Sequence, residues 1–138
     1  MKLKEKPRLK VVDSRFLQKT FNCSPYTWGI YADFQEEETI FIISGISLDK
    51  AHTTLAHELT HFWQKRNCPQ EQSLELIEGF AEWVAYQLAA DQKLPRAMLG
   101  IRRNGEEPYR SGFQKLCLLE SRLGVKGAIK KVKTCKSI

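Results

Sequence analysis

The sequence predicts an α+β domain in which a short β-sheet packs against several helices. Two observations lead to this prediction. Residues 30–43 hold two strand-like apolar runs around an acidic turn. Residues 50–65 and 71–92 instead carry apolar side chains at steps of three and four, as helices do. The chain has 138 residues, 42% hydrophobic and 28% charged, so we expect a single minimal domain over 1–138. Its basic N-terminal segment, 1–12, could be flexible.

The N-terminal half supplies the expected strands. Residues 13–21 read as a short helix, because Asp13 or Ser14 can serve as its N-cap. Ile30–Phe34 and Thr39–Ser44 read as strands joined by the acidic turn. The second strand contains a continuous apolar run, which indicates that both of its faces are covered.

Helices dominate the second half of the chain. Four are expected, at Lys50–Lys65, Glu71–Gln92, Phe113–Leu123 and Lys126–Lys133. The first two have the clearest apolar stripes, which give each helix one face for the core. The segment 95–112 contains Pro95 and an Asn104-Gly105 turn, and it shows no readable pattern.

The most informative stretch is His57-Glu58-Leu59-Thr60-His61, inside the first long helix. Two histidines four residues apart lie on one face of a helix, so both imidazoles can bind one metal ion. Glu58 lies about 100° further round the axis. There its carboxylate can act on a water beside the metal without ligating the metal. This pattern suits zinc hydrolysis, in which zinc lowers the pKa of water toward ~7 and a carboxylate relays the proton.

A catalytic zinc site usually has three protein ligands, and the second long helix offers the third. Glu78 and Glu82 lie one turn apart on that helix. A turn near Asn67–Pro69 would send the helix back alongside the first. Glu78 is then the expected third ligand, and Glu82 is expected to accept the second ring N–H of His57. A solvated helix face is the alternative interpretation of both glutamates.

With these residues in place, the sequence resembles the gluzincins, zinc peptidases with His-Glu-x-x-His followed on a second helix by Glu-x-x-x-Asp or Glu. It is similar in more detail to the peptidase domain of the ubiquitin-activated LIM-domain peptidases that restrain plant organ growth, and to bacterial relatives of that domain. The likeness spans roughly residues 25–132. Its motifs here are Leu55–His61 with Trp63, Glu78-Gly79 and Tyr109–Phe113. The chain shows neither the LIM modules nor the ubiquitin-interacting helices of the plant proteins, so regulation by ubiquitin is not expected.

The resemblance implies a zincin-like domain, a Zn²⁺ cofactor and an endopeptidase that acts on a peptide or protein substrate. It also implies a strand edge that pairs with the extended substrate. Thr39–Ser44 is the candidate for that strand, and a strand fully paired inside the sheet is the alternative. Tyr86 and Tyr109 are candidates for stabilising the oxyanion, with a purely structural tyrosine as the alternative. Gly79 is expected to let the two long helices approach closely around the metal.

Two other functions stay open on this sequence. One is a catalytically weak or latent zinc-containing module that binds proteins, and the other is a zinc hydrolase of non-peptide substrates. An intact Glu58 argues against a purely structural zinc site, which needs no base.

The composition narrows the range of partners. The net charge of +6 comes from lysines and arginines near both ends. We interpret them as a solvated rim and expect no nucleic-acid partner, because no motif of a known nucleic-acid module occurs. No secretory signal, membrane span or Cys-x-x-Cys pair is recognised. We therefore expect a cytoplasmic protein with reduced thiols and no membrane partner. No pattern specifies the oligomeric state.

Overall fold

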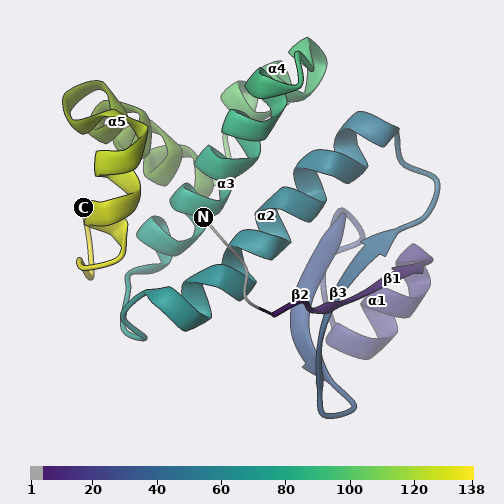
Figure 1. Ribbon diagram of the computed structural model, residues 1–138. Helices are drawn as coiled ribbons and strands as arrows, with labels where there is room; N and C mark the ends of the chain where they lie inside the picture. The colour runs from purple at the N-terminus through teal and green to yellow at the C-terminus, as the bar shows by residue number, and fades with distance from the viewer. Residues whose placement is uncertain (1–4) are drawn as a thin grey trace.

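The computed structural model describes residues 5–138 and arranges them as five helices and a three-stranded mixed sheet (Figure 1). The strands are β1 (Arg8–Val12), β2 (Gly29–Phe34) and β3 (Glu37–Ile43). The helices are α1 (Ser14–Phe21), α2 (Leu48–Asn67), α3 (Leu74–Asp91), α4 (Pro95–Arg103) and α5 (Tyr109–Val132). The α+β class predicted from the sequence is confirmed.

The sheet has the order β1-β3-β2, with β1 parallel and β2 antiparallel to the central strand β3. Alternate side chains of β3 point to opposite faces. Phe41 packs against α1, with its ring centroid 5.2 Å from that of Phe21. Ile40 and Ile42 are buried on the other face, where α2 contacts the sheet. The apolar run therefore does belong to a strand covered on both faces.

The central position of β3 corrects one expectation. Thr39–Ser44 cannot offer a free edge to a substrate, because β1 pairs with Thr39–Ile43 on one side of β3 and β2 pairs with Glu37–Ile42 on the other. Within residues 5–138, the outer strands of the sheet are β1 and β2. Strand order depends on contacts between distant segments, which the sequence pattern of one strand does not encode.

The N-terminal segment contains a strand that the sequence pattern does not predict. Residues 8–12 form β1, in register with β3 from Arg8 beside Thr39 to Val12 beside Ile43. Residues 1–4 of the predicted segment lie outside the described part of the chain. Leu9 and Val11 remain 55% and 67% exposed, so β1 is held mainly by hydrogen bonds to β3. A strand that buries so little leaves only a weak apolar signal in its sequence.

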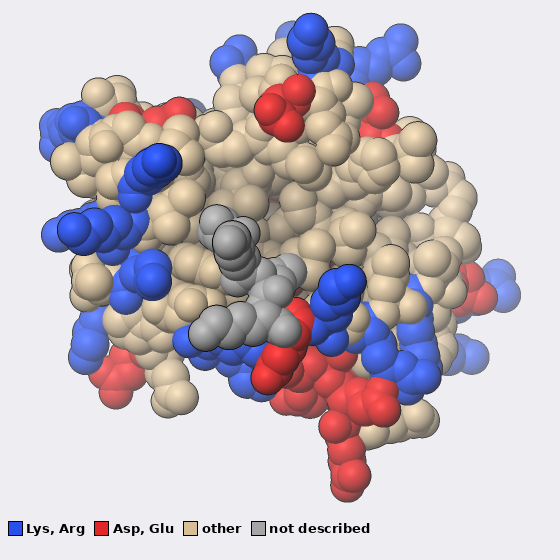
Figure 2. Space-filling view, in the orientation of Figure 1, with Lys and Arg blue, Asp and Glu red and all other residues tan. Residues whose placement is uncertain are grey.

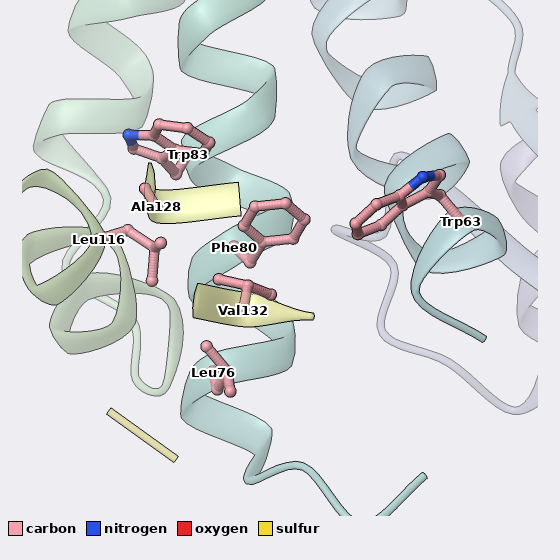
Figure 3. Close-up of a cluster of buried hydrophobic side chains, with 7 residues drawn as sticks. All are labelled: Trp63, Leu76, Phe80, Trp83, Leu116, Ala128 and Val132. Carbon is pink, nitrogen blue, oxygen red and sulfur yellow. The ribbon is translucent and has the colours of Figure 1, made fainter. Parts of the chain in front are cut away.

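Helix α2 lies against the sheet, and α3 lies between α2 and α5 (Figure 1). Their shared core is a cluster of buried side chains (Figure 3), made of Trp63, Leu76, Phe80, Trp83, Leu116, Ala128 and Val132. Full burial of a large apolar side chain contributes roughly 1.5–3 kcal/mol. The buried indole of Trp83 donates to Glu120 at 2.8 Å, so its polar atom is satisfied. This core fixes α3 between its two neighbours.

Helix boundaries follow recognisable end signals. Asp13 caps α1 by accepting from the Phe16 N–H at 2.7 Å, as predicted. The two predicted C-terminal helices are the two halves of α5, which are separated by the non-helical Gly124 with φ 72° and ψ 174°. Helix α4 lies where no helix was expected, and it starts at Pro95. Proline can end a helix, but it also favours the first turn of one, which is its place in α4.

Charged side chains lie around the rim of the molecule. Figure 2 shows lysine and arginine side chains spread over several sides of one face, and acidic side chains gathered toward its lower edge. This distribution favours the interpretation of the net positive charge as a solvated rim. All four cysteines are free thiols. Among residues 5–138, no helix combines the length and hydrophobicity that a membrane crossing requires.

Candidate metal centre

Helices α2 and α3 bring together the three residues predicted as metal ligands. His57 Nε2 lies 3.1 Å from Glu78 Oε2, and His61 Nε2 lies 3.4 Å from the same oxygen. One ligand atom from each of the three lies within 4.8 Å of the others. Two imidazole nitrogens and one carboxylate oxygen are a donor set that suits zinc. The residues present therefore fit the metal that the sequence suggests.

The position of α2 explains this convergence. Phe62 packs toward the sheet, with its ring centroid 6.0 Å from that of Tyr31. The next residue, Trp63, packs toward α3, 5.7 Å from Phe80. With α2 held on both sides, the histidine face is turned toward Glu78. The side chains of His57, His61 and Glu78 are 12%, 17% and 17% exposed, so the site lies between the core and solvent.

Glu82 contacts the histidine that was predicted for it. Its Oε1 lies 2.9 Å from His57 Nδ1. A carboxylate only accepts hydrogen bonds, so Nδ1 carries a proton and Nε2 is the nitrogen that faces Glu78. A carboxylate placed in this way fixes the ring orientation of a metal-binding histidine.

The charged groups of the site stabilise one another when no metal is bound. Burial disfavours the charged form of His57, but hydrogen bonds to Glu78 and Glu82 outweigh burial and raise its pKa to about 10. Burial also acts to raise the pKa of Glu78, while hydrogen bonds from His57 and His61 lower it to about 2. The metal-free cluster is therefore an imidazolium between carboxylates. A metal must displace the proton on His57 Nε2 in order to bind.

Glu58 lies beside this cluster and is held by the sheet. Its Oε2 accepts a hydrogen bond from the backbone N–H of Tyr31 at 2.9 Å. Tyr31 is on the outer strand β2, and its N–H points to α2 instead of to β3. The charge of Glu58 also contributes to the raised pKa of His57. Because the partner is a backbone group, no residue type could have revealed this contact in the sequence.

The two tyrosines proposed to stabilise the oxyanion, Tyr86 and Tyr109, have different surroundings in the structure. The Tyr109 ring lies 6.0 Å from the His57 ring, centroid to centroid. Burial, together with the negative charges of the site's glutamates, raises the Tyr109 pKa to about 12. Tyr86 instead packs on Phe113, with ring centroids 5.3 Å apart. Of the two, Tyr109 is the tyrosine whose ring contacts a candidate ligand.

A pocket and a glutamine complete the surroundings of His61. The pocket, of about 420 Å³, lies among Tyr31, His61, the end of α2 and the 68–72 segment. The glutamine is Gln64, whose Oε1 is 2.9 Å from His61 Nδ1. Our reading of the sequence missed Gln64, although it lies three residues after His61 and hence on the same side of the helix.

Comparisons of this chain with protein-family models, curated proteins and solved structures find no match. The likeness to the gluzincins therefore depends on the sequence motifs and on the geometry of this site.

Proposed function

We propose that this chain is a zinc-dependent endopeptidase of the gluzincin type, with a zincin-like fold. The observation that carries the proposal is the meeting of His57 Nε2 and His61 Nε2 at one oxygen of Glu78. Structural zinc sites generally have four protein ligands, whereas catalytic sites have three and keep one position open. Among residues 5–138, one metal-ligand cluster is found, and it has three members. When bound there, zinc would activate water and polarise the scissile carbonyl.

Glu58 is the proposed general base and then the acid. It is on the same helix as both histidines, one residue after His57. The hydrogen bond from the Tyr31 N–H occupies Oε2 and leaves the second oxygen for proton transfer. Glu58 would take a proton from the attacking water and pass it to the leaving amine.

The outer edge of β2 is the proposed place for an extended substrate. Residues alternate in an antiparallel strand between those bonded to the neighbour and those facing outward. The Trp28 carbonyl pairs with Ile43, so the register makes Gly29, Tyr31 and Asp33 the outward-facing residues. The Tyr31 N–H is already bonded to Glu58, so a peptide paired with this edge would bond to the Tyr31 carbonyl and to Gly29 and Asp33, and would pass beside Glu58. This edge favours a peptide over a compact non-peptide substrate. The edge of β2 replaces the strand at 39–44 as the proposed substrate-pairing strand.

The decisive test is cleavage by the zinc-loaded chain. A peptide library or a denatured protein would be incubated with the parent and with Glu58→Gln, and the products identified by mass spectrometry. We expect the parent to cleave and the variant to be slower by about 10²-fold or more, the scale of general-base catalysis, with unchanged zinc content. Equal cleavage by both proteins would contradict the role of Glu58. A folded, zinc-loaded parent that cleaves nothing would favour the protein-binding alternative.

A further inference from the structure

His61 is held by a glutamine of its own helix that also reaches α3. Gln64 Oε1 lies 2.9 Å from His61 Nδ1, and Gln64 Nε2 donates to the carbonyl oxygen of Ile77 at 3.1 Å. Gln64 is only 6% exposed. Ile77 directly precedes Glu78, so one buried side chain links a candidate ligand on α2 to the backbone next to another on α3.

These two bonds determine which nitrogen of His61 carries a proton. A carbonyl oxygen only accepts, so the amide group that faces Ile77 must be the NH₂ of Gln64. Its Oε1 then faces His61, and because this oxygen also only accepts, the ring must donate from Nδ1. Nε2, which lies 3.4 Å from Glu78 Oε2, is then the ring nitrogen left to face the ligand oxygen and a metal ion. With Nδ1–H held by Gln64, the ring would bind a metal through Nε2.

An uncharged amide is also better suited than a carboxylate as the hydrogen-bond partner of His61. Glu58, Glu78 and Glu82 already place three carboxylates around the two histidines. A fourth negative charge beside His61 would add repulsion within a largely buried group. An amide can orient the ring without adding charge, and it cannot lose or gain a proton in the ordinary pH range.

We propose that Gln64 is the positioning residue for His61: it fixes the Nδ1–H form of the ring and, through the Ile77 carbonyl, holds α3 where Glu78 can reach the same ion. The inference rests on the proposed zinc site. Gln64 contacts neither the metal nor the substrate in this scheme. Its effect is therefore on metal affinity and on the form of the ring.

Metal affinity gives the first test. Gln64→Met keeps the length of the side chain and removes both hydrogen bonds, and zinc affinity would be measured by competition with a chelator. We expect a loss of about 10–100-fold, as for other residues that orient a ligand. Gln64→Glu restores an acceptor for Nδ1–H and should recover affinity relative to the methionine variant.

A second buried glutamine provides the matched control. Gln72 is 8% exposed and donates to the Val132 and Cys135 carbonyls. Gln72→Met should lower stability and keep the zinc affinity of the parent. If Gln64→Met and Gln72→Met have equal affinity for zinc, Gln64 is a structural residue only and the inference is overturned.

The ring form itself can be read in the metal-free protein by ¹⁵N NMR of the histidine side chains. We expect His61 to carry its proton on Nδ1 in the parent and to shift toward the Nε2–H form in Gln64→Met. A parent spectrum with His61 protonated on Nε2 alone overturns the inference, even if the methionine variant does not fold. A parent that shows the Nδ1–H form but binds no zinc overturns the proposed function instead. If the parent binds zinc and cleaves peptides, and Gln64→Met binds zinc equally well, only the inference about Gln64 is overturned.

Discussion

Gly79 of α3 and Gly112 of α5 meet backbone to backbone. A Cβ atom added to Gly112 would lie 2.6 Å from the Gly79 Cα, and one added to Gly79 would lie 2.7 Å from the Gly112 carbonyl oxygen. Atoms do not pack at such distances, so both positions require glycine. The sequence predicts instead that Gly79 lets α3 approach α2 closely around the metal. That expectation was wrong, because the close approach is between α3 and α5.

This contact connects two of the motifs that carry the family resemblance. Glu78-Gly79 and Tyr109–Phe113 are 30 residues apart in the chain, and the two glycines bring them together. Tyr109 lies one helical turn before Gly112 on α5. The close packing of the two helices therefore places the Tyr109 ring 6.0 Å from that of His57.

The first prediction concerns this packing. Alanine is a better helix former than glycine by about 1 kcal/mol, yet Gly112→Ala should destabilise the protein by about 1–3 kcal/mol, because overpacking dominates. Gly100 in α4 is the matched control, since an added Cβ meets no atom within 4 Å. Gly100→Ala should stabilise by about 0.4–1 kcal/mol. Urea unfolding of both variants measures the two signs, and a stabilised Gly112→Ala would contradict the packing argument.

The second prediction concerns Tyr109. If its hydroxyl stabilises the oxyanion, Tyr109→Phe should lower kcat by about 10²-fold, the effect of removing one such donor. Zinc affinity should be unchanged, because the ring remains and no ligand is lost. Tyr86→Phe is the control, since Tyr86 packs on Phe113 away from the ligands. Equal kcat values for the parent and Tyr109→Phe would exclude the role.

The residues of the candidate site were predictable where one helix fixes their spacing. His57, Glu58 and His61 share α2, and Glu78 and Glu82 share α3, so their relative positions follow from helix geometry. The apolar periodicity of each helix also indicates its buried face. Together these two patterns were sufficient to predict which side chains of α2 and α3 would meet.

Features that depend on distant segments could not be predicted in the same way. β1 is held by β3, which lies about 30 residues later, and its exposed Leu9 and Val11 give no burial signal. The strand order, and with it the free edge of β2, depends on the same pairing. Tyr31 acts on Glu58 through its backbone N–H, which any residue but proline would provide.

The third prediction concerns Glu38, which ties the sheet to α2. Its carboxylate accepts from Arg66, from the Tyr31 hydroxyl and from Lys65. The bond from Arg66 is the main cause that lowers the Glu38 pKa from 4.5 to about 2. A lowered pKa means that this stabilisation is fully present above pH 4.5 and is lost as the pH falls toward 2.

Glu38→Gln should therefore lower the free energy of unfolding at neutral pH, and the gap to the parent should narrow as the pH falls through that window. Urea unfolding at several pH values measures the gap. Glu36→Gln, in the exposed turn beside it, should differ little from the parent throughout. A gap for Glu38→Gln that stays constant from neutral pH to pH 2 would contradict this account.

The fourth prediction ranks the two glutamates of α3. Glu78→Ala removes a proposed ligand, so two imidazoles remain and zinc affinity should fall steeply. Glu82→Ala leaves all three ligands and removes only the acceptor of His57 Nδ1–H, a contact that typically contributes 10–100-fold in affinity or activity. Glu75→Ala is the control on the same helix, because Glu75 bonds to Ser111 and Lys115 and not to a histidine.

Zinc titration against a competing chelator separates these outcomes. Affinity should decrease in the order parent and Glu75→Ala, then Glu82→Ala, then Glu78→Ala. A larger loss in Glu82→Ala than in Glu78→Ala would mean that the roles are reversed, with Glu82 as the ligand. Unchanged affinity in both variants would place the third ligand elsewhere. The gluzincin assignment would then be wrong even if His57 and His61 do bind zinc, because a glutamate ligand on the second helix defines that group.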